Sequence, residues 1–416
     1  MKILIIGNGG REHAIGWKLK QNSDVELFFA PGNGGTAQIG ENVNIGVSEI
    51  KKLANFAEEK SIDITVVGPE LPLTLGVADE FNRRGLKIFG PGAEGARLEG
   101  SKAYAKQFMR KYNIPTAKYT AVTNIDDGMK LLEQSSFPLV VKANGLASGK
   151  GVVVCVDKAE AEAALTDMLE EGVFGDAGNL VIIEEYLVGR EVSLLCFTDG
   201  ETIIPMETAS DYKRALDGDM GANTGGMGSI SPSPYYKPGM GNEIAIKTLQ
   251  GIKSEGYDYR GVIYIGLILT DKGPKVLEYN ARFGDPETQA LLPRLESNFA
   301  WILSAVVDKR LSECEIKWDN NKAVSVVMAS DGYPGVFEKG HSIDIPKTAS
   351  LVFHAGTSIA DNADSSDGKP VTDGGRVLAV TALGKSFEEA RKTAYSDVEK
   401  IKFQGSRYRS DIGATS

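Results

Sequence analysis

The sequence predicts a multi-domain α/β protein that begins with a doubly wound parallel sheet. Over residues 1–90, apolar runs such as 2–7 (KILIIG) and 64–70 (ITVVGPE) alternate with helix-like stretches such as 48–60 (SEIKKLANFAEEK). Strands that alternate with helices along a chain favour a parallel sheet. At 416 residues the chain is also long enough for roughly two to four domains.

Later segments have a different pattern, which predicts further domains of mixed α and β structure. Residues 99–112 are expected to form one helix that leads out of the first unit. Strands are expected at 137–143, 152–157, 180–187, 323–330 and 376–384, helices at 159–172 and 386–401, and long polar loops at 217–234 and 358–370. We expect a Rossmann-like N-terminal domain (1–101), a central α+β domain (102–320) with a subdomain at about 120–190, and a small C-terminal α+β domain (321–416).

Composition excludes several classes of protein. The net charge of −10 argues against a nucleic-acid partner, because no basic surface is evident. Three scattered cysteines and three histidines favour neither a disulfide framework nor a zinc site. No segment has the apolar length of a membrane span, and the first apolar run is too short for a signal peptide. A cytoplasmic enzyme or binding protein without membrane contact is expected.

The stretch 276–289 (VLEYNARFGDPETQ) places many polar groups along one strand. Alternation predicts that Glu278, Asn280 and Arg282 share a face with Val276, while Leu277 and Tyr279 face the core. A solvated face with a surface ion pair is one interpretation. An asparagine in mid-strand and two further acids in the following turn, Asp285 and Glu287, favour a functional site.

The first glycine-rich loop, 7–12 (GNGGRE), follows a strand and opens a helix, where backbone N–H groups can bind phosphate. It departs from the dinucleotide fingerprint because Glu12 stands at the third glycine position and no acid closes the second strand. A phosphorylated small molecule, a structural turn and a nicotinamide site remain open, in that order of preference.

The second loop, 145–151 (GLASGKG), departs from a phosphate-binding P-loop. It is one residue short, Gly151 replaces the Ser or Thr, and a strand follows it. Such a hairpin can close over nucleotide phosphates, with cations from Lys142 and Lys150, although Lys142 could equally be a surface lysine. Glu184 and Glu185 end an apolar strand, either as its exit into solvent or as part of a nucleotide pocket with Leu187 as an apolar wall.

Four stretches together resemble the ATP-grasp superfamily of carboxylate–amine ligases and, within it, the phosphoribosylamine–glycine ligase family. They are 6–14 (IGNGGREHA), 142–152 (KANGLASGKGV), 222–232 (ANTGGMGSISP) and 282–289 (RFGDPETQ). The last is the most specific, and 371–384 (VTDGGRVLAVTALG) also looks similar. The resemblance covers nearly the full chain and implies a pre-ATP-grasp domain, an ATP-grasp domain with a lid, and a C-terminal domain.

The resemblance implies a reaction in which ATP, glycine and 5-phosphoribosylamine give glycinamide ribonucleotide, ADP and phosphate through a glycyl phosphate, the second step of de novo purine synthesis. Mg²⁺ or Mn²⁺ would be held by Glu278 and Asn280, while Arg282 and Lys142 would act in catalysis. The implied ATP contacts are Lys102, Lys142, Gly149, Lys150, Gly151, Glu184, Glu185, Leu187 and Glu191. The implied substrate contacts are Gly9, Gly10, Arg11, Glu12, Asp211, Lys213, Asn223, Thr224, Gly225, Arg282, Asp285 and Glu287.

Other functions remain as alternatives. A different ATP-grasp ligase, such as a carboxylase, is disfavoured by RFGDPE, and a non-catalytic nucleotide sensor is disfavoured by the presence of Glu278, Asn280 and Arg282. Many ATP-grasp enzymes carry another metal-binding acid on the preceding strand, but 261–270 (GVIYIGLILT) has none, so a full second metal site is not expected. We expect a monomer, with a weak dimer as the alternative.

Overall fold

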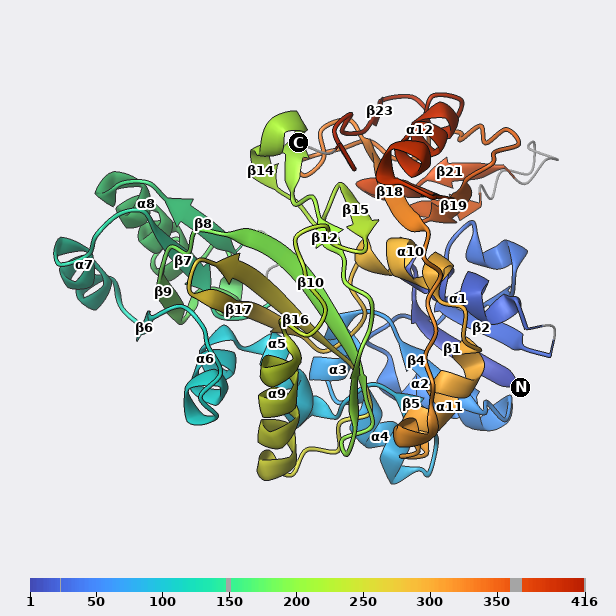
Figure 1. Ribbon diagram of the computed structural model, residues 1–416, viewed down its shortest axis with the longest axis horizontal. Helices are drawn as coiled ribbons and strands as arrows, with labels where there is room; N and C mark the ends of the chain where they lie inside the picture. The colour runs from blue at the N-terminus through green and yellow to red at the C-terminus, as the bar shows by residue number, and fades with distance from the viewer. Residues whose placement is uncertain (23, 147–150, 360–368, 415–416) are drawn as a thin grey trace.

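The N-terminal domain is built around a five-stranded parallel sheet, as predicted (Figure 1). The computed structural model describes residues 1–22, 24–146, 151–359 and 369–414. The strand order is β3-β2-β1-β4-β5. The elements are β1 (Lys2–Gly7), β2 (Glu26–Pro31), β3 (Glu41–Asn42), β4 (Ile64–Val67), β5 (Ile88–Phe89), α1 (Gly10–Lys20), α2 (Ile50–Glu59), α3 (Glu70–Thr74), α4 (Val77–Arg83) and α5 (Ala93–Gly100).

Strand β1 lies at the centre of this sheet because both of its faces are apolar. Leu4 and Ile6 pack into one hydrophobic cluster, and Ile3 and Ile5 into another on the opposite face. All four side chains are fully buried. The glycine loop that follows β1 lies at the carboxyl end of the parallel strands, and it contacts the central domain, since Arg11 donates to the Phe283 carbonyl at 3.0 Å.

The lid lies at one end of the molecule (Figure 1). Its four strands form a sheet of order β6-β9-β7-β8, with antiparallel neighbours, and its helices bury the core around Leu165 and Met168. Its elements are β6 (Tyr119–Val122), β7 (Leu139–Ala143), β8 (Val152–Cys155), β9 (Val181–Glu185), α7 (Ile125–Glu133) and α8 (Lys158–Leu169). The glycine-rich loop thus joins two antiparallel strands, as the failed P-loop pattern predicted.

An antiparallel sheet of order β11-β10-β16-β17 connects the lid to the N-terminal domain (Figure 1). Apolar residues of β10 and β16 extend both hydrophobic clusters of the N-terminal sheet, so the two domains share their cores. The elements are β10 (Arg190–Thr198), β11 (Ile203–Pro205), β16 (Gly261–Thr270), β17 (Gly273–Asn280), α9 (Asn242–Glu255), α10 (Glu287–Leu291) and α11 (Phe299–Val307).

The C-terminal sheet has the order β12-β15-β18-β22-β19, with β23 also pairing with β18. Strands β12 and β15 lie inside the range expected for the central domain, yet they pair with the C-terminal strands, so the segment 212–227 between them is fixed to this domain. The elements are β12 (Ser210–Asp211), β15 (Gly228–Ser231), β18 (Lys322–Ser330), β19 (Leu351–His354), β22 (Arg376–Gly384), β23 (Ser406–Arg407) and α12 (Phe387–Val398). Two hairpins complete the fold: β13 (Arg214–Leu216) with β14 (Met220–Asn223), and β20 (Thr357–Ile359) with β21 (Pro370–Thr372).

Two sequence expectations about secondary structure are wrong. The interval 217–234 is not one loop, because it contains β14 and β15. The helix expected at 99–112 is two helices, since α5 ends at Gly100 and α6 (Lys102–Lys111) starts anew. Ser101 separates them in an extended conformation and caps α6 by accepting a hydrogen bond from the Tyr104 N–H.

Candidate active site

A cleft of about 1,320 Å³ lies between the lid, the central sheet and the two terminal domains. Most of the residues that the sequence singled out line it, although they come from distant parts of the chain. The predicted residues that line the cleft are Arg11, Lys102, Lys142, Gly151, Glu184, Leu187, Glu191, Asp211, Lys213, Asn223, Thr224, Gly225, Glu278, Asn280, Arg282, Asp285 and Glu287.

Four predicted site residues are not part of this lining: Gly9, Gly10, Glu12 and Glu185. The Glu185 carboxylate instead accepts hydrogen bonds from the Lys118 N–H, at 3.0 Å, and from Lys275, at 3.1 Å. Gly149 and Lys150, the expected tip of the lid, lie outside the described residues.

One end of the cleft is lined by the buried charged side chains of Lys106, Lys142 and Glu184, which we call the floor of the cleft. Glu184 on β9 accepts contacts from Lys142 on β7 at 3.0 Å and from Lys106 on α6 at 3.1 Å. Its other carboxylate oxygen, Oε1, is buried and has no hydrogen-bond partner among the described residues. Lys102 donates to the Gly145 carbonyl at 3.0 Å, which joins α6 to the glycine-rich hairpin. Burial lowers the pKa of Lys102.

The two oxygen donors proposed for the metal lie at the end of β17, beside this floor. Both Glu278 and Asn280 line the cleft, and Lys213 Nζ is 3.9 Å from Glu278 Oε1. Burial opposes ionisation of Glu278, but Lys213, Lys142 and Lys102 outweigh it and hold its pKa below the ordinary value. A carboxylate that stays ionised next to an amide oxygen is a suitable pair of hard ligands for Mg²⁺.

The simple alternation predicted for β17 is wrong at its start. The pairing with β16 shifts between Leu267 and Gly266, so Leu277 is an extra residue in a β-bulge. Val276 therefore packs in the core with Tyr279, and Leu277 lines the cleft. The bulge changes which side chains face the core while leaving Glu278 and Asn280 at the cleft.

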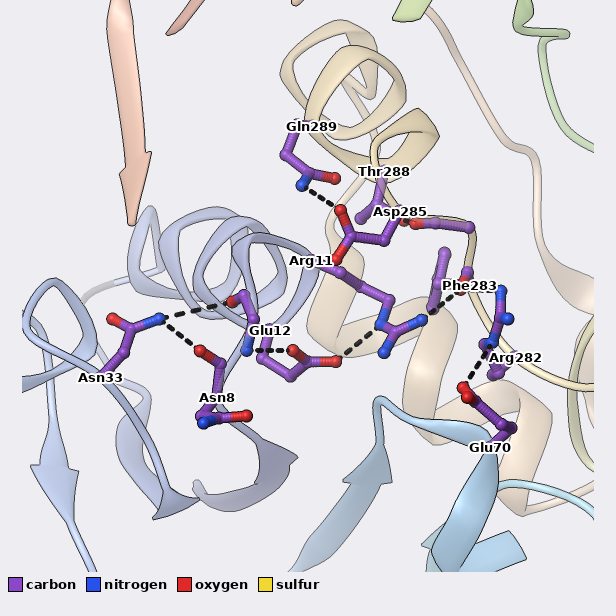
Figure 2. A network of polar contacts seen from close by, with 12 residues as sticks. Asn8, Arg11, Glu12, Asn33, Glu70, Arg282, Phe283, Asp285, Thr288 and Gln289 are labelled. Carbon is purple, nitrogen blue, oxygen red and sulfur yellow. Dashed lines mark hydrogen bonds and ion pairs between the residues drawn. The ribbon is translucent and has the colours of Figure 1, made fainter. Parts of the chain in front are cut away.

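Arg282 is held by two acids that the sequence analysis did not single out. Its guanidinium lies 2.6 Å from Glu99 and 3.4 Å from Glu70, and it donates to the Phe283 carbonyl at 3.2 Å (Figure 2 shows the Glu70 contact). Burial raises the pKa of Glu99 to about 7, although Arg282 and the Ala281 N–H favour the charged carboxylate. The contact to Glu70 is the longer one and is the easier to exchange for a ligand.

The N-terminal glycine loop is braced by Glu12 (Figure 2). The Glu12 carboxylate accepts from the Gly9 N–H at 2.5 Å and from Arg11 at 2.6 Å, and Arg11 also donates to the Phe283 carbonyl at 3.0 Å. Gly68 is required beside it, because a Cβ there would lie 1.9 Å from Glu12 Oε1. Glu12 thus stabilises the conformation of the turn. Arg11 connects the turn to the RFGDPE segment and lines the cleft.

The opposite end of the cleft combines an acid from β12, Asp211, with Glu287, which follows the RFGDP turn. Glu287 Oε1 accepts from Ser193 at 2.9 Å and Tyr264 at 2.8 Å. Asp211 Oδ1 is buried and has no hydrogen-bond partner among the described residues. Burial and the neighbouring Glu287 raise the pKa of Asp211 well above its ordinary value. The raised pKa favours the protonated form of the Asp211 carboxyl group at ordinary pH.

Arg376 brings the C-terminal domain into the site, and the sequence analysis missed it. It donates to the carbonyls of Gly225 at 2.6 Å and Asp285 at 2.9 Å, and its guanidinium is 3.3 Å from the Asp285 carboxylate. Burial opposes ionisation of Asp285, but Arg376 and Arg11 outweigh it and lower its pKa. Gln289 donates to the same carboxylate at 2.8 Å (Figure 2).

Two residues that contact predicted site residues or their neighbours also escaped the sequence analysis, for different reasons. Lys106 lies one helical turn after Lys102, and this i, i+4 spacing on α6 was a usable signal. Asn144 gave none. Its side chain accepts from Ser101 Oγ at 3.0 Å and the Ala103 N–H at 2.8 Å, so it fastens the end of β7 to the start of α6.

Within the described ranges, none of the helices is long and apolar enough to cross a membrane. No cluster of three or more acidic, histidine or cysteine side chains there has the arrangement of a metal site. Glu278 and Asn280 provide only two possible metal ligands, one of which is an amide, so they do not form a cluster of that kind.

Comparisons with known proteins agree with this architecture. Family models of phosphoribosylglycinamide synthetase match the N domain at residues 1–99, the ATP-grasp (A) domain at 100–288 and the C domain at 323–415. A phosphoribosylamine–glycine ligase of Caldanaerobacter subterraneus is 50% identical, with 100% of each chain covered, and one from Vibrio vulnificus is 48% identical, covering 99% of this chain and 98% of the relative.

Solved structures show the same relationship. The crystal structure of phosphoribosylamine–glycine ligase from Thermotoga maritima has a TM-score of 0.84 and 37% identity, covering 99% of this chain and 100% of that chain. The biotin carboxylase domain of Hydrogenobacter thermophilus 2-oxoglutarate carboxylase has a TM-score of 0.75 at 14% identity, covering 98% and 91%, which shows a shared fold alone. This chain is an ATP-grasp ligase and belongs to the phosphoribosylglycinamide synthetase family.

Proposed function

We propose that this ligase joins glycine to 5-phosphoribosylamine at the expense of ATP, through a glycyl phosphate, and that both steps take place in the described cleft. The observation that carries the proposal is the convergence of a lysine-rich floor, an acid–amide pair and Arg282 in one cavity. In the purine pathway this reaction is the second de novo step. ATP would lie over the floor, with its base near Glu184 and Leu187 and its phosphates near Lys102 and Lys142.

Activation of glycine requires positioning and charge neutralisation, and no covalent protein nucleophile. A carboxylate oxygen of glycine attacks the γ-phosphorus, ADP leaves, and the glycyl phosphate forms. Glu278 and Asn280 would hold Mg²⁺ or Mn²⁺, which neutralises phosphate charge when bound. Arg282 would exchange its longer contact with Glu70 for the carboxylate or acyl phosphate, which a planar guanidinium can hold through two parallel bonds.

The second step needs an amine aimed at the acyl carbon. The nitrogen of phosphoribosylamine forms the amide bond, the acyl C–O bond breaks, and phosphate leaves with the surplus proton of the amine. We assign phosphoribosylamine to the end of the cleft between Arg11 and the segment 212–227, where Lys213, Asn223, Thr224 and Gly225 line the wall. The unpartnered Asp211 Oδ1, next to Glu287, is the group that we assign to the glycine amine.

One chain supplies every residue in this scheme, which supports a monomer as the catalytic unit. The proposal includes a cytoplasmic location, because ATP and the other substrates are metabolites of that compartment. A coupled assay of ADP release with a panel of amino acids and freshly made phosphoribosylamine tests it. ADP release that requires both glycine and the amine is expected, and equal release without glycine would contradict the proposal.

A further inference from the structure

The hairpin β13–β14 forms part of the cleft wall, yet it belongs to none of the larger sheets (Figure 1). Arg214, Asp219 and Asn223 of this hairpin line the cleft. Within the described part of the chain its two strands form a sheet of their own, and their register shifts between Arg214 and Leu216. Since a two-stranded hairpin is at best marginally stable by itself, other contacts must hold it in place.

A segment of the C-terminal domain, 409–413 (RSDIG), supplies such contacts. Arg409 is 2% exposed and donates to the Arg214 carbonyl at 3.0 Å. The Gly218 N–H donates to the Asp411 carboxylate at 2.9 Å. The RSDIG segment therefore fastens both the first strand and the turn of the hairpin to the C-terminal domain.

The guanidinium of Arg409 is itself held in a fixed orientation. Its Nε and Nη2 donate to the two carboxylate oxygens of Asp411 at 2.8 Å and 2.7 Å, the pair of parallel bonds that a planar guanidinium can make. Its Cζ lies 5.2 Å from the centre of the Tyr212 ring. Burial opposes ionisation of Asp411, but Arg409 and the Gly218 N–H outweigh it and lower its pKa. The pair thus stays charged, and Nη1 is directed at the hairpin.

Lys213 is the cleft residue that these contacts hold in place. Arg409 contacts the residues immediately before and after it. Lys213 Nζ lies 2.8 Å from the Glu191 carboxylate and 3.9 Å from that of Glu278, the acid assigned to the metal. Partial burial opposes the charged form of Lys213, but Glu191 and Glu278 outweigh it and raise its pKa. A charged ammonium group therefore lies next to the proposed metal site.

We propose that Arg409 is a positioning residue for the ligase reaction. Through its paired bonds with Asp411 it holds the hairpin so that Lys213 stays beside Glu278, where the ammonium group neutralises phosphoryl charge as a glycine oxygen attacks the γ-phosphorus and ADP leaves. The inference rests on the proposed function and adds to it a residue that touches no reacting atom. Phosphoryl transfer depends on cations that are in place beforehand, and a misplacement of about 1 Å can cost roughly 100-fold in rate. Loss of Arg409 would release the hairpin, while ATP would keep its contacts with the floor of the cleft.

The first test measures how fast acetic anhydride labels Lys213, by peptide mass spectrometry, in wild-type protein and in Arg409→Met. This measurement does not depend on turnover. Only the neutral amine is acetylated, so an ion-paired lysine reacts slowly, and its release should raise the labelling roughly tenfold for a fall of one pKa unit. Arg407→Met is the matched control, because Arg407 lies two residues earlier, is exposed and pairs with Asp331 outside the cleft.

Turnover then shows whether Arg409 acts through Lys213. Arg409→Met should lower kcat for glycine-dependent ADP release by roughly 10- to 100-fold and leave the KM for ATP within about twofold of wild type. In a Lys213→Met background the same substitution should lower kcat no further, because the two residues act as one unit. A purely structural effect of Arg409 would lower kcat in both backgrounds.

The outcomes separate the positioning role from the proposed function. If Arg409→Met does not fold, Asp411→Asn weakens the same pair more gently, and the same increase in Lys213 labelling is expected. Unchanged labelling of Lys213 in the folded variant, or kcat losses that multiply in the double variant, would overturn the positioning role. If the labelling responds as expected but wild-type protein releases ADP equally well without glycine, the proposed function fails and the placement of Lys213 by Arg409 stands.

Discussion

Acidification from pH 7 to pH 5 is expected to weaken the contact between the N-terminal and C-terminal domains, because two neutral histidines are buried there. His13 on α1 and His354 on β19 are 7% and 4% exposed. The backbone N–H of His354 donates to His13 Nδ1 at 2.8 Å, so Nδ1 of His13 must be unprotonated in the folded protein. Burial, reinforced by His354, lowers the pKa of His13 to about 3, and burial lowers that of His354 to about 4.

The direction follows from proton uptake. Since both pKa values are lower in the folded protein than the ordinary value of 6.5, the unfolded chain binds more protons between about pH 6.5 and pH 4. The contribution of the two histidines to the free energy of unfolding is therefore largest above that range and falls as the pH decreases through it. The raised pKa of Glu99 acts in the opposite direction, because the folded protein binds that proton more tightly than the unfolded chain. At pH 5 each histidine lowers the free energy of unfolding by about 2 kcal/mol, or about 4 kcal/mol together, from proton linkage. That is a large part of the roughly 5–15 kcal/mol typical of folded proteins.

Urea unfolding at pH 7, 6 and 5, followed by fluorescence, measures the effect, and histidine NMR signals measure its cause. The sequence has three histidines, so His341→Gln identifies the signal of the third and serves as the matched control. His13→Asn retains an acceptor near the position of Nδ1 but cannot be protonated. Relative to wild type, it should remove about 2 kcal/mol of destabilisation between pH 7 and pH 5. The reasoning is refuted if the His13 and His354 signals titrate near pH 6.5, or if His13→Asn keeps the full pH dependence.

Four substitutions test other parts of the structure. Glu278→Gln should lower turnover by roughly 100-fold or more with little change in stability, and near-normal activity at ordinary Mg²⁺ would remove Glu278 from the metal site. Arg282→Lys should lower glycine-dependent ADP release by roughly 100-fold, because an ammonium cannot reproduce the planar fork; wild-type kcat/KM would exclude a two-bond role. Gly68→Ala, whose Cβ would lie 1.9 Å from Glu12, should cost about 1–3 kcal/mol in urea unfolding, and an unchanged midpoint would show that the turn can relax. Ser101→Ala should cost about 1 kcal/mol through loss of the helix cap, whereas Ser101→Gly should cost only a few tenths.

Much of the fold followed from local sequence patterns. The alternation of apolar strands and helices over residues 1–90 is a short-range signal, and it predicted the parallel sheet around β1. The departures of 145–151 from a P-loop likewise indicated two strands joined by a hairpin. These predictions succeeded because side-chain period and turn chemistry depend on neighbouring residues.

The site was predictable in part for a similar reason. Glu278, Asn280 and Arg282 stand two residues apart near the end of a strand, and the chain places all three at the cleft. The same rule failed at Val276, because a bulge depends on how β17 pairs with β16 and cannot be seen in the alternation itself.

The sequence by itself determined the alternation of strands and helices over residues 1–90 and the family, because the patterns that carry both are local and distinctive. Only the tertiary structure decided that Lys106 and Lys142 share one oxygen of Glu184, that Glu99 and Glu70 hold Arg282, and that Arg376 reaches the RFGDPE turn. The physical reason is that an ion pair depends on distance and burial, and both are set by packing between segments that are far apart in the chain.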